Sequence, residues 1–127
     1  MSLDILPVVP EGRQLIQSYG DRQFQISKKL YDQPVLVFPE QTMHWLPVDV
    51  HHLTVDDFCT VVNAEPPIDL LLMGCGKSPW FQMPRLRNDL KNRGIVLELM
   101  DTGAACRTFN VLLGEDRRVA AALIPVD

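Results

Sequence analysis

The sequence lacks the features that mark secreted, membrane-spanning and nucleic-acid-binding proteins. Its three cysteines are odd in number, which does not suit a closed disulfide framework and favours reduced thiols in a cytosol-like compartment. No apolar run approaches the length of a membrane span, and residues 1–4 resemble neither a secretory signal nor a mitochondrial presequence. Twelve basic residues against sixteen acidic ones form no basic stripe for nucleic acid. We therefore expect a cytoplasmic protein that binds no nucleic acid and does not insert into a membrane.

Motifs for metal binding and catalysis are also missing. His51 and His52 are adjacent, so their side chains diverge on most backbones, and the cysteines are too dispersed for a zinc site. Cys75 and Cys106 stand near expected helix starts, where the pKa of a thiol can be lowered. A thiol nucleophile also needs a nearby base, and the histidines belong to other segments. We expect no metal, no cofactor and no catalytic residue, and the reactivity of the two thiols stays open.

What the sequence does contain is the pattern of one α/β domain over residues 1–127. The hydrophobic fraction is 46%, and the length is sufficient to bury a core. The first half is mostly β. Alternating residues on both sides of Gly20-Asp21 predict a hairpin over 15–26, and the apolar run 35–38 between two prolines predicts a buried strand. A further strand is expected over 42–48.

The second half alternates between helix and strand. Thr54 and Asp57 predict a capped helix start, and Pro84 and Gly94 delimit another helix. Continuous apolar runs predict buried strands between the helices. The expected elements are a helix over 54–62, a strand over 68–73, a helix over 84–93, a strand over 95–100, a helix over 102–113 and a strand over 119–126.

A candidate ligand crevice follows from this order. Strand 68–73, helix 84–93 and strand 95–100 form a crossover unit, so both strands run parallel and end at the same edge of the sheet. Ligands of open α/β sheets bind beyond such strand ends, and the amides of a helix start suit an anion. The candidate ligand-binding residues are Gly74, Cys75, Gly76, Asp101, Thr102, Gly103 and Arg107. The alternative is structural: Asp101 or Thr102 caps the helix, and Arg107 pairs with Asp101 or Glu98.

Two aromatic residues stand in the loop before helix 84–93. Trp80 and Phe81 are adjacent, and exposed aromatic side chains beside a crevice are typical of a protein-protein interface. Aromatic side chains that cover a sheet edge are equally common. We therefore hold Trp80 and Phe81 as candidate partner-binding residues.

Three segments together resemble a known family. Residues 73–76 after a buried strand, residues 101–112 and the ending 120–125 are similar to the Mth-type domain family of unknown function. Its mitochondrial branch is NADH:ubiquinone oxidoreductase complex assembly factor 3. The likeness extends from the hairpin onward and is strongest over 94–126. The start of this chain separates it from the organellar branch, so we expect a bacterial member.

The resemblance implies an α/β fold of three layers: a central mixed sheet, flanking helices and an additional N-terminal β layer. The residue pattern favours a parallel last strand, whereas a mixed sheet leaves its direction open. Family members often carry threonine at the position of Cys75, which argues against an essential nucleophile there. The implied function is a non-catalytic interaction or assembly module with a protein partner. The alternative is binding or processing of a small anionic metabolite at the crevice.

Overall fold

The structure, a computed structural model, describes residues 12–47, 50–77 and 83–127. These residues form two sheets: one of three strands, in the order β1-β2-β3, and one of five strands, in the order β5-β4-β8-β6-β7. The small sheet contains β1 (Ile16–Gly20), β2 (Gln23–Ile26) and β3 (Lys29–Tyr31). The large sheet contains β4 (Val35–Val37), β5 (Thr42–His44), β6 (Leu70–Gly74), β7 (Val96–Met100) and β8 (Val119–Leu123). The helices are the 3₁₀ helix η1 (Val55–Phe58), α1 (Cys59–Val62), α2 (Pro84–Lys91) and α3 (Thr102–Gly114).

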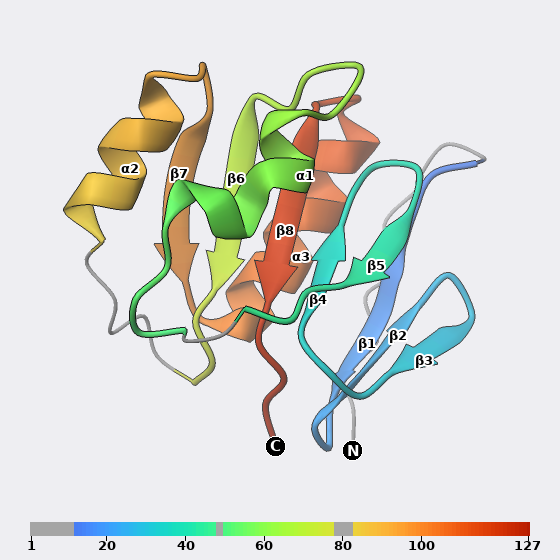
Figure 1. Ribbon diagram of the computed structural model, residues 1–127. Coiled ribbons are helices and arrows are strands. Elements are labelled where there is room, and N and C mark those ends of the chain that lie inside the picture. The colour runs from blue at the N-terminus through green and yellow to red at the C-terminus, as the bar shows by residue number, and fades with distance from the viewer. Residues whose placement is uncertain (1–11, 48–49, 78–82) are drawn as a thin grey trace.

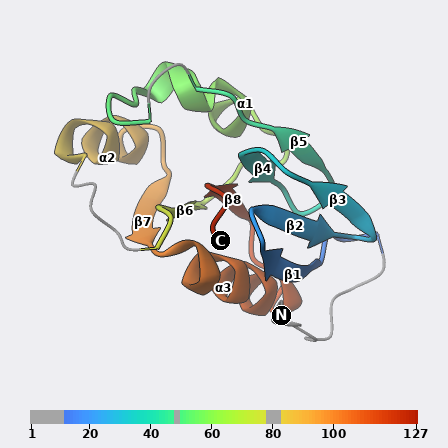
Figure 2. The ribbon, with the colours of Figure 1, turned by 90° about the horizontal axis from the view of Figure 1, so that it is seen from below.

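The elements are arranged in layers around the five-stranded sheet. Helices α1 and α2 lie on one face, whereas α3 and the three-stranded sheet lie on the other (Figures 1 and 2). Apolar side chains fill both interfaces, because each face of the central sheet carries its own buried cluster. The expected fold, a central mixed sheet with flanking helices and an additional N-terminal β layer, is confirmed.

The direction of the last strand is settled by its two neighbours. Strand β8 pairs in parallel with β6, with Leu70 opposite Val119, and antiparallel with β4, with Val35 opposite Leu123. Strands β6 and β7, joined through α2, are parallel as the crossover pattern predicts. The sheet is therefore mixed, and the parallel expectation for β8 is correct with respect to β6.

Some expected boundaries are wrong. The two residues between β1 and β2 are Asp21 and Arg22, with φ of 51° and 60°, whereas Gly20, with φ of 131°, is the last residue of β1. A second tight turn at Ser27-Lys28, with φ of 48° and 71°, leads into strand β3, which the residue pattern does not predict. Neither Ser27 nor Lys28 is the asparagine or glycine that usually marks such a turn, so this turn carries no local signal.

The remaining differences shorten expected elements. The expected strand over 42–48 ends at His44, and the last strand ends at Leu123. The capping box of Thr54 and Asp57 is present, yet the four residues after Thr54 form a 3₁₀ helix, and only 59–62 are α-helical. Element ends are where local sequence competes least well with tertiary packing.

The centre of the sheet is built from small residues. Ala120, Ala121 and Ala122 in β8 are all 0% exposed, because layers cover both faces of this strand. Alanine lets those layers approach closely: Phe109 and Leu113 of α3 belong to the cluster that includes Ala121, on one face of the strand.

A buried amide fastens the small sheet to α3. Asn110 is 0% exposed; its Nδ2 donates to the carbonyl of Ile16 at 2.8 Å, and its Oδ1 accepts from the Ile16 N–H at 3.0 Å. The side chain thus satisfies both peptide groups of Ile16, as a neighbouring strand would. The N-terminal β layer is therefore held by hydrogen bonds as well as by apolar contact.

Replacing this amide tests the attachment. We expect Asn110→Leu to lower the free energy of unfolding by about 2–3 kcal/mol, because both Ile16 peptide groups lose their buried partner. Amide hydrogen exchange should rise across β1–β3 more than across β6. The control Asn88→Leu, on the exposed side of α2, should change stability by less than about 0.5 kcal/mol. Equal loss in both variants would contradict this role.

Candidate functional site

The two loops expected to form a crevice lie side by side and are hydrogen-bonded to each other. The N–H of Cys75 donates to the carbonyl of Met100 at 2.8 Å, and the N–H of Thr102 donates to the carbonyl of Gly76, also at 2.8 Å. These bonds continue the parallel pairing of β6 and β7 beyond the strand ends. The structure therefore brings the 74–76 and 101–103 segments together at one edge of the sheet.

The side chain of Thr102 joins three segments at this edge. It is 0% exposed, its Oγ1 accepts from the N–H of Gly76 at 3.0 Å, and its hydroxyl donates to the carbonyl of Ile124 at 2.7 Å. The ends of β6 and β8 and the start of α3 thus meet on one oxygen. Both the donor and an acceptor site of the hydroxyl are used inside the protein.

Gly74 allows the close approach that this arrangement requires. A Cβ atom there would lie 3.0 Å from Leu123 Cδ2 and 3.1 Å from the Cα of Thr102. The second contact is with backbone, which cannot move aside without shifting the start of α3. The glycine before Cys75 is therefore explained by packing between β6, β8 and α3.

Asp101 is the N-cap of α3. Its side chain accepts a hydrogen bond from the N–H of Ala104 at 2.7 Å, so it satisfies one of the free amides at the helix start. The structural alternative drawn from the sequence, capping, accordingly describes the geometry of Asp101. The N–H of Thr102 is also engaged, by Gly76.

Arg107 has a partner that the sequence did not indicate. Its Nη1 donates to the hydroxyl of Tyr19 in β1 at 2.7 Å, rather than pairing with Asp101 or Glu98. The same hydroxyl lies 2.6 Å from where a Cβ atom of Gly103 would be, so the tyrosine ring packs on this glycine. Tyr19 comes from a different layer, and only the tertiary structure brings it to the start of α3.

The two cysteines near the loops are buried. Cys75 is 1% exposed and Cys106 is 0% exposed. Burial raises the pKa of the Cys75 thiol to about 11 and the pKa of the Cys106 thiol to about 12. Both thiols are protonated at neutral pH, the opposite of what an activated nucleophile requires. The third cysteine, Cys59, is exposed.

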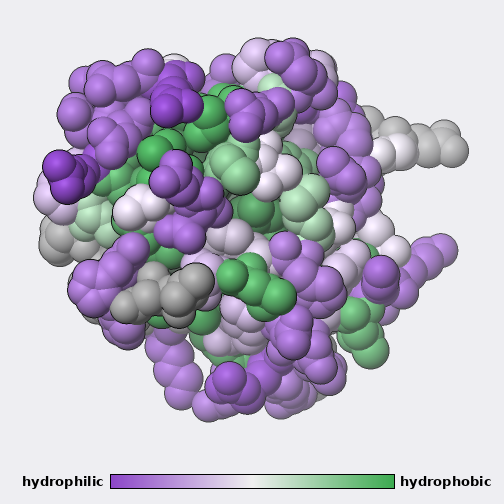
Figure 3. All heavy atoms as spheres, in the orientation of Figure 1, coloured by the Kyte–Doolittle hydropathy of each residue, from purple (hydrophilic) through white to green (hydrophobic). Residues whose placement is uncertain are grey.

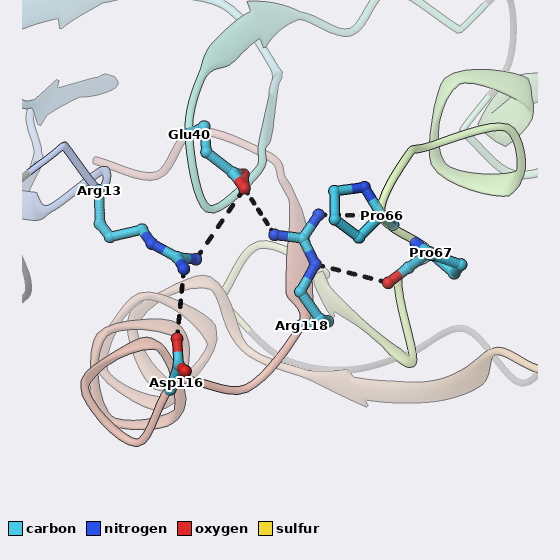
Figure 4. Close-up of polar contacts among 6 residues, drawn as sticks. All are labelled: Arg13, Glu40, Pro66, Pro67, Asp116 and Arg118. Atoms are coloured by element: carbon cyan, nitrogen blue, oxygen red, sulfur yellow. Dashed lines mark hydrogen bonds and ion pairs between the residues drawn. The ribbon is translucent and has the colours of Figure 1, made fainter.

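A second polar cluster lies at the opposite end of β8. Arg118 Nη1 lies 2.6 Å from Glu40 Oε1 and also donates to the carbonyls of Pro66 and Pro67, while Arg13 pairs with Asp116 at 3.2 Å (Figure 4). Beside it is a cavity of about 600 Å³, lined by Phe38, Glu40, Gln41, Cys59, Thr60, Asn63, Ala64, Glu65 and Arg118. The paired charges hold the β4–β5 turn against the end of α3, which is a structural role.

The candidate partner-binding residues and the expected absence of a metal site remain to be compared with the structure. Trp80 and Phe81 lie outside the described residues. Within the part of the chain that is described, no three histidine, cysteine or acidic side chains are grouped so that they could hold a metal ion. No helix of those residues is long and apolar enough to cross a membrane.

Comparison with known proteins identifies the family. The family described as protein of unknown function (DUF498/DUF598) matches residues 16–124. The chain belongs to this family. A solution structure from Bordetella pertussis, called a Mth938-like domain, superposes with a TM-score of 0.78 over 97% of this chain and 92% of that one, at 21% identity, and supports the fold alone. The resemblance seen in the sequence is thereby confirmed.

Sequence relatives carry the name NADH dehydrogenase (ubiquinone) 1 alpha subcomplex assembly factor 3. The protein of that name from Danio rerio is 33% identical over 124 residues, which cover 98% of this chain and 71% of the relative. The human protein of that name is 33% identical over 110 residues, which cover 87% of this chain and 60% of the relative. The relatives are therefore longer than the shared domain.

Another structural neighbour carries a different name. A crystal structure from Bartonella henselae, described as an outer membrane protein, has a TM-score of 0.80 and 34% identity over 91% of this chain and 98% of that chain. The names of similar proteins thus point to more than one cellular setting.

Removing the Thr102 hydroxyl tests its role. We expect Thr102→Val to lower the free energy of unfolding by about 3 kcal/mol, because the Gly76 N–H and the Ile124 carbonyl lose their buried partner while the side-chain volume stays similar. Urea denaturation measures the change. The matched control is Thr108→Val on the same helix, because within the described residues the Thr108 side chain makes no hydrogen bond. If both valine variants lose equally little, the bridge is not important for stability.

The raised thiol pKa values predict how stability depends on pH. Below the ordinary thiol pKa of 9.0, both the folded and the unfolded chain keep these protons. Above it the unfolded chain releases them first, so the free energy of unfolding should fall as the pH rises from about 9 towards the folded values. Urea denaturation midpoints measured at each pH follow this change in the wild type and in the double variant Cys75→Ala, Cys106→Ala. The midpoint of the variant should fall less steeply with pH. Identical slopes would contradict the buried, protonated state.

Proposed function

We propose that this protein is a non-catalytic interaction module that helps to assemble a larger protein complex. Relatives at 33% identity are named as assembly factors, and the shared region covers nearly all of this chain. Those relatives are longer than the shared domain, and the need for a protein partner belongs to the domain that this chain shares with them. The partner we expect is a protein subunit of the complex.

One observation from the structure carries the proposal. The hydroxyl of Thr102 bridges Gly76 and Ile124, and the carboxylate of Asp101 caps α3, so these polar groups are used to join segments of the chain. A binding site for a metabolite would instead leave such donors and acceptors directed at the ligand. The arrangement favours a rigid scaffold that presents its outer surfaces.

The buried thiols support the absence of covalent catalysis. Cys75 donates its S–H towards the carbonyl of Met73 at 3.5 Å, and burial raises its pKa to about 11. At neutral pH such a thiol has little thiolate with which to attack a substrate. A cytoplasmic location is part of the same proposal, since the three cysteines are free thiols.

A second candidate function rests on Arg107. Its side chain is exposed in the second turn of α3 and donates to the hydroxyl of Tyr19, which leaves further N–H groups without a hydrogen-bond partner among the described residues. A small anionic metabolite bound there would contact Arg107 and the loops 74–76 and 101–103. This alternative retains the candidate ligand-binding residues predicted from the sequence.

Affinity capture distinguishes the two functions. The tagged protein is recovered from native lysate, and mass spectrometry identifies both the retained proteins and the retained small molecules. Two double variants are compared with the wild type: one carries Trp80→Ala and Phe81→Ala, and the other carries Asp101→Ala and Arg107→Ala. Circular dichroism checks that each of them folds. We expect a protein partner that is lost in the aromatic variant, because truncating interface aromatics commonly costs more than about 1 kcal/mol.

The opposite pattern would support the alternative. A metabolite retained by the wild type and lost only in the Asp101→Ala, Arg107→Ala variant would make this a ligand-binding protein. Retention of neither a protein nor a metabolite by the wild type would contradict both proposals.

A further inference from the structure

Basic residues are concentrated around helix α2. The chain carries a net charge of −4, yet residues 77–93 contain five basic side chains and a single acidic one, Asp89. Lys77 lies 3.9 Å from Asp127. The other four have no carboxylate within 4.0 Å among the described residues; they are Arg85, Arg87, Lys91 and Arg93. Figure 3 shows hydrophilic residues over this helix.

This helix lies beside β7, which is an edge strand of the central sheet in the part of the chain that the structure describes. Strand β7 is the last strand on its side, after β6 (Figure 1). The N–H of Val96 donates to the carbonyl of Asp69 at 3.0 Å, so alternate residues from 96 onward direct their peptide groups to β6. Leu97 and Leu99 therefore direct theirs outward. No described strand pairs with these outward groups.

The side chain of Arg87 connects the helix to that edge. Its Nη1 donates to the outward carbonyl of Leu97. One stripe of α2, formed by Pro84, Arg87, Asn88 and Lys91, lines a hollow of about 420 Å³. Because Arg87 belongs to both, the hollow and the free edge of β7 are neighbours. Among the described residues nothing pairs with the N–H of Leu97 or with either peptide group of Leu99, so these groups can bind a further strand.

The other face of β7 is partly apolar and exposed. Val96 is 53% exposed and Glu98 is exposed as well, because α3 crosses β6 and β8 instead of β7 (Figure 2). A strand added to this edge would point alternate side chains towards Arg87 and Lys91 on one face and towards Val96 on the other. The added strand would therefore need acidic side chains at the positions that face Arg87 and Lys91, and apolar side chains at the alternate positions that face Val96.

We infer that the α2–β7 edge, defined by Arg87, Lys91, Val96, Leu97 and Leu99, binds an extended segment of a partner protein in which acidic and apolar residues alternate. The carboxylates pair with the two cations, the apolar side chains cover Val96, and the backbone adds a strand to the sheet. The inference rests on the proposed function, since it names the class of segment that a protein partner would supply.

Charge selects this occupant over a second copy of the chain. Pairing of two β7 edges would bring two α2 helices together and oppose their uncompensated cations, which disfavours self-association here. An acidic segment instead neutralises those cations. Arg87 on the Leu97 carbonyl also protects the edge from indiscriminate pairing, as charged side chains on edge strands do.

The probe is a fluorescein-labelled peptide of four Glu-Val repeats, with four Gln-Val repeats as its uncharged match. Fluorescence anisotropy with the purified wild-type chain measures both. We expect the acidic peptide to bind and to weaken as sodium chloride is raised, because exposed ion pairs are screened by salt. We expect Lys91→Glu to weaken its binding by about fivefold, as one reversed surface pair would. Arg117→Glu, the same charge change beside β8, is the control and should bind as the wild type does.

Strand addition has its own readout. Two further peptides carry N-methyl groups on all the valines or on all the glutamates, with the charge unchanged. Along an added strand the N–H groups alternate between the two sides, so one N-methylated peptide should lose binding and the other should retain it. Equal affinity of the two would overturn strand addition.

The remaining outcomes are also decisive. Equal weakening in Lys91→Glu and Arg117→Glu, or no binding of the acidic peptide, would overturn the α2–β7 edge as the site. Binding of anionic lipid vesicles or of duplex DNA, which Lys91→Glu weakens while the peptide stays unbound, would assign the cations to another partner. None of these results contradicts a protein partner that affinity capture finds. Failure of this site is therefore distinguishable from failure of the proposed function.

Discussion

The hydroxyl of Thr102 is the contact on which the rest of the arrangement depends. It lies where two parallel strands end and the last helix begins, and it satisfies the peptide groups of Gly76 and Ile124 in a place that solvent does not reach. An unpaired buried peptide group is costly, so the loops keep this geometry as long as the hydroxyl is present. Gly74 complements the bridge, since any larger residue would push against the backbone of α3.

A fixed start of α3 also positions the three-stranded sheet, which lies on the same face of the central sheet as this helix. Along this helix, the ring of Tyr19 packs on Gly103, and Arg107 donates a hydrogen bond to the Tyr19 hydroxyl. Asn110 binds the backbone of Ile16. One face of α3 therefore holds β1, the strand to which the rest of the three-stranded sheet is paired. The polar groups that made the loops look like a ligand site are largely occupied by these internal contacts, and the surfaces left without partners among the described residues lie at α2 and β7 instead.

Most of the fold was predictable because its signals are local. Apolar runs predicted the buried strands β4, β6, β7 and β8, and a capping aspartate together with apolar spacing predicted α3. The crossover rule alone placed the 74–76 and 101–103 loops together at one edge of the sheet. Strand β3 was missed because the turn at Ser27-Lys28 adopts positive φ without glycine or asparagine. The partner of Arg107 was missed because Tyr19 is distant in sequence.

By itself the sequence determined the family, the alternation of strand and helix, and which residues stand at the ends of parallel strands. These depend on periodicity, turn chemistry and handedness, which act over short stretches of chain. Only the tertiary structure decided that Thr102 is buried as a bridge, that Arg107 donates to a tyrosine, and that the cations of α2 lie beside a strand edge with which no described strand pairs. Each of these joins residues from separate layers, and no local pattern encodes which side chains meet when the layers pack.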